Sequence, residues 1–197
     1  MIGFLRRVLR PAVTILVAMT VITGVAYPLA VTAIAQVVFP FQANGSMIFV
    51  DGKTVGSSLI GQFFNEPQYF WGRPSAATSS AAPGGYDASN SAGSNLGPTS
   101  KALIDTIAQR VDDMRKANGG GPVPVDLVTS SASGLDPSIS PAAAEYQVAR
   151  VASARGMTED QVRTYVARHT TQPLLGFLGE PQVNVLELNL DLDGLLK

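Results

Sequence analysis

The sequence of 197 residues contains no cysteine and a single histidine. The absence of cysteine excludes disulfide bonds, zinc–thiolate sites, iron–sulfur clusters and thiol nucleophiles. Charged residues are also scarce, at 15% of the chain, against roughly 25% in ordinary soluble domains. The net charge of −1 argues against a dedicated nucleic-acid-binding protein, because such proteins carry a basic patch. The hydrophobic content of 46% nevertheless indicates a folded chain.

The shortage of charge is concentrated near the N-terminus. No Asp, Glu, Lys or Arg occurs from Pro11 to Val50, and residues 13–38 are almost continuously apolar. An α-helix of that length is about 39 Å long, enough to cross a hydrocarbon core of about 30 Å with some tilt. We therefore predict a transmembrane helix over residues 13–38.

The charges on either side of this segment predict its orientation. Arg6, Arg7 and Arg10 precede it, whereas acidic residues outnumber basic ones in the remainder of the chain. The positive-inside rule places a short N-terminus, residues 1–12, in the cytoplasm. Residues 39–197 then form one extracytoplasmic, periplasmic domain.

Two other interpretations of the apolar segment are open. A cleaved secretory signal peptide would also carry the arginines, and Ala33-Ile34-Ala35 resembles its small-residue cleavage site. A signal h-region, however, usually has only about 7–15 residues. A buried core helix would normally show a polar face over this length. An uncleaved anchor is the interpretation that fits both the length and the composition.

Within the predicted helix, Pro28 removes one backbone donor and its ring crowds the carbonyl of Gly24. Small residues flank it and leave room for a second helix to approach closely. This small-residue strip consists of Thr20, Thr23, Gly24, Ala26 and Ala30. The strip indicates packing against a helix of a partner, and a simple kink is the alternative.

After the helix, the sequence indicates strands first, then helices, then a strand. This order of elements predicts an α+β fold for the domain. Residues 46–55 indicate a β-hairpin closed by Asp51-Gly52. Ser75–Thr99 is rich in Ser, Ala, Gly, Pro and Asn and predicts a long loop, either functional or disordered. The remaining expected elements are a helix from the Thr99 cap to Gly119, an extended piece over 123–129, a helix from Ser140-Pro141 to Gly156, a third from the Thr158–Gln161 capping box to about Arg168, and a strand over 183–192.

Catalytic motifs are missing from this domain. No phosphate-binding loop occurs, and Gly119-Gly120-Gly121 follows a helix instead of preceding one. Gly93-Ser94-Asn95-Leu96-Gly97 has asparagine where a nucleophile elbow requires serine. Ser133, His169 and Asp136 could still form a catalytic triad. The alternative function is therefore a membrane-anchored periplasmic hydrolase. A cleaved, soluble periplasmic binding protein is a third possibility.

An ordered series of short stretches resembles one known family, the C subunit of the bacterial potassium-transporting Kdp P-type ATPase (KdpC). The stretches are Thr23-Gly24, Tyr27-Pro28-Leu29, residues 42–46, 58–63, Tyr69-Phe70, 73–76, 93–99, 124–129, 133–137, 139–143, 150–152, 178–181 and 183–186. Each stretch alone is weakly specific, but the whole series in order is highly specific.

The resemblance implies an accessory subunit of a high-affinity, ATP-driven potassium import pump in the bacterial inner membrane. Its implied partners are a potassium-channel-like subunit, a P-type ATPase subunit and a small single-span subunit, together with membrane lipid and without nucleic acid. The family is described as a catalytic chaperone that raises the ATP affinity of the ATPase subunit. This chain lacks the Asp-Lys-Thr-Gly phosphorylation motif, so it is not the hydrolase. We expect no catalytic residue, metal or cofactor in this chain, while direct contact with ATP is left open.

The residues most suited to contact partners fall into two groups. The first lies in the predicted helix and consists of Thr20, Thr23, Gly24, Tyr27 and Pro28. The second lies in the domain and consists of Gln62, Tyr69, Phe70, Arg73, Ser94, Asn95 and Leu96. Arg73 offers a planar fork of five donors suited to carbonyls or a carboxylate of a neighbouring chain. The aromatic residues 63, 64, 69 and 70 are equally compatible with a core position.

Overall fold

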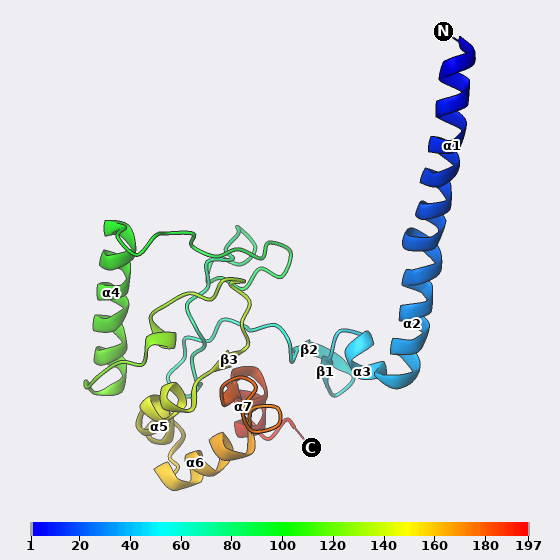
Figure 1. Ribbon diagram of the computed structural model, residues 1–197. Helices are drawn as coiled ribbons and strands as arrows, with labels where there is room; N and C mark the ends of the chain where they lie inside the picture. Colours follow the sequence, from blue (N-terminus) through cyan, green and yellow to red (C-terminus); the bar gives the residue numbers. More distant parts are fainter. Residues whose placement is uncertain (1, 197) are drawn as a thin grey trace. The chain divides into compact units, whose positions relative to one another are not determined.

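The computed structural model describes residues 2–196 and separates into two compact units. The first unit ends at Met47 and the second begins at Ile48. The first is helical, and the second mixes helices with short strands, as the α+β prediction requires (Figure 1).

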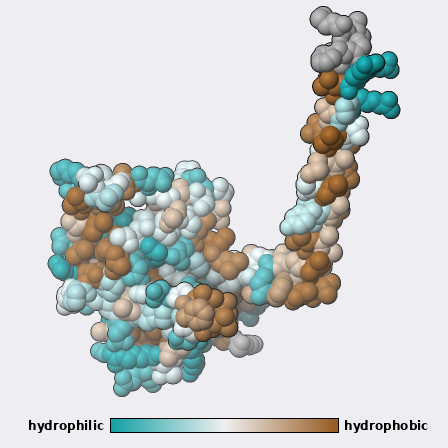
Figure 2. All heavy atoms as spheres, in the orientation of Figure 1, coloured by the Kyte–Doolittle hydropathy of each residue, from teal (hydrophilic) through white to brown (hydrophobic). Residues whose placement is uncertain are grey.

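The first unit is dominated by one long apolar helix. It comprises α1 (Ile2–Val21), a π-helical turn η1 (Ile22–Ala26) and α2 (Tyr27–Val38). The candidate span Arg6–Val38 has 33 residues and contains an 18-residue window with a mean hydropathy of 2.0. None of its residues is buried within the protein. Figure 2 shows apolar side chains along this helix. By length and composition the helix can cross a membrane, and it starts earlier than the predicted residue 13.

The π turn lies directly before Pro28. The backbone N–H of Tyr27 donates to the carbonyl of Ile22, five residues earlier. The wider turn accommodates the proline, which has no N–H of its own, without ending the helix. The hydroxyls of Thr20 and Thr23 donate to the carbonyls of Leu16 and Met19 at 2.8 and 2.7 Å. Both hydroxyls are therefore satisfied within the helix. After α2 the chain forms one further short helix, α3 (Pro40–Ala43).

The predicted hairpin forms at the start of the second unit. Its strands are β1 (Met47–Val50) and β2 (Lys53–Ser57), which pair with each other. Asp51 and Gly52 have φ angles of 48° and 76°. Positive φ at both central positions defines the type I′ turn, whose twist matches that of the flanking strands.

The other elements of the second unit surround one core. A three-stranded antiparallel sheet has the order β3 (Ser138–Ile139), β5 (Gln182–Asn184) and β4 (Thr170–Thr171), with Val183 opposite both Ile139 and Thr170. The helices are α4 (Lys101–Asn118), the 3₁₀ turn η2 (Val125–Leu127), α5 (Pro141–Arg155), α6 (Glu159–Arg168) and α7 (Val185–Leu192). The buried core cluster contains Phe70, Leu127, Ile139, Ala143, Ala144, Val148, Val151, Ala152, Val162, Val183, Val185 and Leu188.

The helix boundaries agree closely with the capping signals. Ser140 accepts a hydrogen bond from the Ala143 N–H, and Pro141 is the first residue of α5. Gly119 and Gly156 end their helices with φ angles of 85° and 66°, in the left-handed region that glycine adopts without strain. The capping box of Thr158 and Gln161 is complete. The cap of α4 is Ser100 instead of the predicted Thr99.

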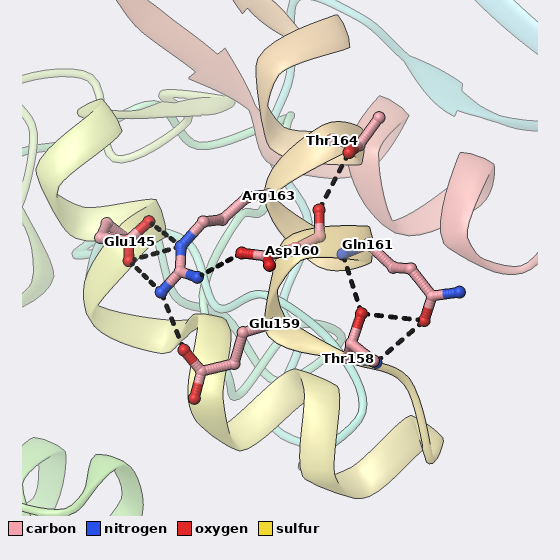
Figure 3. A network of polar contacts seen from close by, with 7 residues as sticks. All are labelled: Glu145, Thr158, Glu159, Asp160, Gln161, Arg163 and Thr164. Carbon is pink, nitrogen blue, oxygen red and sulfur yellow. Dashed lines mark hydrogen bonds and ion pairs between the residues drawn. The ribbon is translucent and has the colours of Figure 1, made fainter.

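An ion-pair network joins α5 to α6 (Figure 3). Arg163 contacts Glu145 of α5 and Glu159 of α6 at 2.8 Å each, and Asp160 at 3.0 Å. These carboxylates raise the pKa of the Arg163 guanidinium, the hydrogen bond to Glu145 being the largest cause. Arg163 therefore stays charged and links the two helices at their exposed surface.

The predicted strand over residues 183–192 is wrong for most of its length. Only Gln182–Asn184 is a strand, and Val185–Leu192 is helix α7. The alternating leucines suggested a strand, but the buried positions Val185, Leu186, Leu188 and Asn189 follow a helical spacing. The side chain of Asn184 accepts from the Glu187 N–H and caps the helix.

The long loop over residues 75–99 is ordered by hydrogen bonds, although it contains no helix or strand. The hydroxyl of Ser75 donates to the Gly134 carbonyl at 2.6 Å and accepts from the Tyr86 N–H at 2.9 Å. The Ala92 N–H donates to the Ser133 carbonyl. These hydrogen bonds attach the loop to Ser133 and Gly134 and favour the ordered alternative.

Candidate functional site

The segment that the sequence marked as rich in aromatic residues is held by two buried side-chain amides. Asn189 Oδ1 accepts from the Phe70 N–H at 2.8 Å, and Nδ2 donates to the Phe70 carbonyl at 3.0 Å. Gln147 does the same for Trp71, at 2.8 and 3.1 Å. Each amide presents one donor and one acceptor, as a neighbouring β-strand would. The backbone at residues 70–71 is therefore fully paired inside the core.

Two arginines extend this attachment. Arg150 donates to the carbonyls of Pro67 and Tyr69 at 2.6 and 3.0 Å, and its guanidinium lies 4.1 Å from the centre of the Trp71 ring. Arg155 donates to the Gln68 carbonyl at 2.7 Å. Burial lowers the pKa of Arg150 to about 10. At neutral pH Arg150 is still charged and gives strong, charge-assisted hydrogen bonds.

Trp71 and the stretches on either side of the attached segment, residues 62–65 and 72–75, line a cavity of about 280 Å³. The opposite wall includes Arg110, Asp113 and Met114 of α4. Most of the lining is apolar, with polar groups at a few places; the principal residues are Gln62, Phe63, Phe64, Trp71, Arg73, Tyr86 and Leu127. A mostly apolar cavity with a few polar groups is typical of a binding site. We take this cavity and its rim as the candidate functional site.

Arg73 is the principal charged group of this wall. Its Nη1 lies 3.0 Å from Asp136 Oδ2, and Nη2 donates to the Thr129 carbonyl at 3.5 Å. Its Nε is buried without a hydrogen-bond partner. Two of the three nitrogens are therefore used inside the domain, although about a quarter of the side chain is exposed.

Tyr86 fixes the position of Arg73 from the other side. The Tyr86 hydroxyl donates to the Arg73 carbonyl at 2.6 Å. Burial of the ring, followed by the negative charge of Asp136, raises the pKa of Tyr86 to about 12. A side chain on Gly72 would lie 2.7 Å from the Tyr86 hydroxyl oxygen. A larger residue at position 72 would push this hydroxyl away from its hydrogen bond with the Arg73 carbonyl.

The structure brings together only some of the sequence-predicted residues of the domain. Gln62 and Arg73 line the cavity, and Gln62 also donates to the Val55 carbonyl at 2.7 Å. Phe70 is fully buried in the core and does not line the cavity. Tyr69 turns toward the C-terminal helix, where its hydroxyl donates to Asp193. Ser94, Asn95 and Leu96 are exposed and do not line this cavity.

The helix residues predicted to contact partners lie in the first unit. Thr20, Thr23, Gly24, Tyr27 and Pro28 are all exposed on the long helix. A side chain added at Gly24 would meet only the Thr20 methyl group, at 3.9 Å. The helix therefore leaves the surface around Gly24 open.

The hydrolase triad is not assembled. His169 Nε2 lies 2.9 Å from Asp191 Oδ2, and Asp136 pairs with Arg73. The Ser133 hydroxyl accepts from the Leu135 N–H within its own turn. The hydrogen bonds from nucleophile to base and from base to Asp136 are therefore absent from the described structure, residues 2–196. Over the same residues, no group of three or more His, Asp or Glu side chains could hold a metal ion.

The sequence did not reveal the residues that position the site. Gln147, Arg150 and Asn189 occupy helix positions that sequence analysis left unmarked. Only Arg150 could have been found from the sequence, because Arg150-Val151-Ala152 is among the stretches that resemble the family. Their partners lie 76 to 119 positions away, so no local pattern could connect them.

These features define a protein that joins one helix of membrane-spanning length to an α+β domain with a small, mostly apolar cavity. The family model for "K+-transporting ATPase, c chain" (KdpC) matches residues 9–194. The chain belongs to the KdpC family.

Relatives named potassium-transporting ATPase KdpC subunit cover nearly the whole chain. The protein of Sorangium cellulosum is 60% identical over 188 residues, which span 94% of this chain and 97% of the relative. That of Rhodopseudomonas palustris is 57% identical and spans 94% and 96%. That of Polaromonas naphthalenivorans is 58% identical and spans 97% and 96%.

Proposed function

We propose that this chain is a non-catalytic accessory subunit of an ATP-driven potassium import pump. The observation that carries the proposal is the family match over residues 9–194, which includes both the long helix and the α+β domain. The chain would assemble with a potassium-channel-like subunit, a P-type ATPase subunit and a small single-span subunit. Its part in the complex would be to assemble and stabilise it.

The proposed placement is a cytoplasmic N-terminus, one membrane span and a periplasmic domain. Arg6, Arg7 and Arg10 before the apolar segment support this orientation. Protease added to intact spheroplasts should then digest the second unit, while a tag at the N-terminus stays protected. Protection of the second unit would contradict the orientation.

The proposed chaperone effect, a higher ATP affinity of the ATPase subunit, would be transmitted through membrane helices or the pore subunit. Direct nucleotide binding is disfavoured by the helix N-termini of the second unit. Helix α5 begins at Pro141, which has no N–H, and α6 carries Glu159 and Asp160 in its first turn. The α4 start has no glycine-rich run before it. None of these matches the amide cluster that a polyphosphate needs.

Co-purification in mild detergent tests the proposal. A tag on this chain should recover two large membrane proteins, identified by mass spectrometry, and a potassium-stimulated ATPase activity. Recovery of the chain alone, with a hydrolytic activity of its own, would instead support the enzyme alternative. Calorimetry of the full chain with ATP tests the proposal that the chaperone effect needs no direct contact between this chain and ATP. A micromolar affinity of this chain for ATP would contradict it.

A further inference from the structure

The loop between β4 and β5 ends in an exposed apolar turn, residues 174–178, which we call the apolar tip. Leu174, Leu175 and Phe177 are 69%, 75% and 72% exposed, and Leu178 is 51% exposed. Figure 2 shows the tip as a compact hydrophobic cluster at the place of the orange loop beside α7 in Figure 1. Single exposed apolar side chains are normal, but a contiguous group marks an interaction site.

The tip is a shaped turn. The N–H of Leu174 donates to the Leu178 carbonyl at 3.2 Å, and the Leu178 N–H donates back to the Leu174 carbonyl at 3.0 Å. Leu175 and Gly176 have φ angles of 56° and 80°. A leucine in the left-handed region costs free energy and is uncommon. The backbone therefore holds the Leu175 side chain outward at a cost in free energy. No packing of Leu175 in the core of the domain compensates for this cost.

The tip is also attached firmly to the core. It connects β4 to β5, and Val183 of β5 is fully buried opposite Thr170. Pro173 and Pro181 flank the turn and restrict its backbone. A rigid apolar projection loses little conformational entropy when it is bound. Its shape therefore suits insertion into a matching pocket.

Charge indicates what kind of surface receives the tip. No Lys or Arg occurs between His169 and Leu196, where the acidic residues are Glu180, Glu187, Asp191 and Asp193. Asp191 and Asp193 have arginine partners, at 3.8 and 2.8 Å. Within residues 2–196, Glu180 and Glu187 have no arginine or lysine partner, and Glu180 is the charged residue nearest to the tip in sequence.

This charge pattern disfavours an anionic lipid surface as the occupant. Interfacial segments that bind anionic lipid are typically rich in Lys or Arg, and the tip is bordered by acidic residues instead. A second copy of this chain that met the first tip to tip would bring equal acidic charges to the same place. An apolar pocket with a basic rim on another protein fits both the apolar projection and its acidic border.

We propose that the apolar tip docks into an apolar, basic-rimmed pocket on another subunit of the potassium-transporting ATPase, an inference that rests on the proposed function. Leu175 and Phe177 are the residues that enter the pocket. Glu180 lies at its basic rim. Contacts of this kind combine a buried apolar centre with a charged border that selects the partner.

Site-specific photo-cross-linking in the assembled complex tests the docking. A benzophenone amino acid at position 177 should form a cross-link to another subunit, identified by mass spectrometry. The matched control is position 104 on α4, where Ile104 is 56% exposed outside the tip, and it should not cross-link to the same peptide. Cross-linking of position 177 to lipid, to a second copy of this chain or to nothing would overturn the proposal.

Substitution at Leu175 tests the basic rim. Leu175→Lys should lower the recovery of partner subunits at least tenfold more than Leu175→Glu, while Ile104→Lys should leave recovery unchanged. Both side chains at position 175 meet the same positive φ, so backbone strain cancels in the comparison. Phe177→Ser, at a position without positive φ, should also reduce recovery without changing the thermal midpoint. Equal recovery for the Lys and Glu variants, or a drop in the midpoint that explains the loss, would overturn the proposal.

Recovery of partner subunits with the wild-type chain distinguishes failure of the proposed function from failure of the proposed docking. If it recovers no partner subunit, the proposed function fails. If it recovers its partners but the changes at Leu175 and Phe177 have no effect, only the docking of the tip fails.

Discussion

Asn189 and Phe70 lie 119 positions apart, yet the Asn189 amide pairs with both backbone polar groups of Phe70 at 2.8 and 3.0 Å. Both residues are almost completely buried. The contact joins the C-terminal helix α7 to the residue directly before Trp71, which lines the cavity. The Asn189 amide thus makes the two backbone hydrogen bonds that a neighbouring β-strand would otherwise make.

Replacing Asn189 should therefore destabilise the second unit strongly. Asn189→Leu leaves the Phe70 N–H and C=O unpaired in the core, which should cost about 2–4 kcal/mol of unfolding free energy. Trp71, the only tryptophan in the chain, provides a fluorescence probe for urea unfolding of the full chain in detergent. Gln109→Leu, at an exposed position of α4, is the matched control and should change stability by less than about 0.5 kcal/mol.

Tyr86 should make stability dependent on alkaline pH. Its pKa is about 12 in the folded chain, against 10.0 ordinarily. The raised value means that the folded state holds the proton more tightly, so the contribution is complete below pH 10 and is lost as the pH rises through 12. The loss should amount to about 2–3 kcal/mol, given 1.36 kcal/mol per unit. Arg150, whose pKa is lowered to about 10 by burial, titrates in the same range with the opposite sign. The test is therefore the difference in unfolding free energy between the wild type and Tyr86→Phe in urea, which should fall by about 2 kcal/mol from pH 9 to pH 11.5.

Arg73 should contribute to folding through its ion pair with Asp136. A double-mutant cycle of Arg73→Ala and Asp136→Asn should give a coupling energy of about 1 kcal/mol, because both side chains are only partly exposed. Arg73→Lys should recover part of this energy. The sequence alone predicted a different result, loss of the complex without loss of folding. A coupling near zero with reduced partner recovery would support that alternative and assign Arg73 to a subunit contact.

Gly24 should be required for assembly but not for insertion. Gly24→Leu adds bulk to an exposed helix position where a new Cβ meets nothing closer than 3.9 Å within the chain. Any loss must therefore come from a neighbouring helix, and we expect recovery of the complex to fall at least tenfold, by about 1.4 kcal/mol or more. Ala33→Leu adds similar bulk outside the small-residue strip and should be tolerated. Normal recovery with Gly24→Leu would exclude packing through the strip.

Features with local causes were predictable from sequence. The apolar helix, the Asp51-Gly52 turn and the caps at Ser140 and Thr158 depend on residues within a few positions of each other. The error at α7 also has a local origin. Alternating leucines outweighed the weaker capping signal of Asn184 and Glu187, and burial against the core selected the helix.

The site could be predicted only in part. The aromatic content of residues 63–71 and the donors of Gln62 and Arg73 pointed to a region that the structure places partly along the cavity. The sequence could not reveal that Phe70 is a core residue while Tyr69 turns away toward Asp193. Successive residues of an extended segment point in opposite directions, and the packing partners decide which direction is inward.

The sequence by itself determined the long apolar helix, the positions of most secondary-structure elements and membership of the KdpC family. These properties depend on composition, on capping and on ordered local motifs. Only the tertiary structure decided that Gln147, Arg150 and Asn189 hold the cavity wall, that His169 pairs with Asp191, and that residues 174–178 project as an apolar tip. Such contacts join distant parts of the chain, and their free energy depends on burial and geometry that exist only after folding.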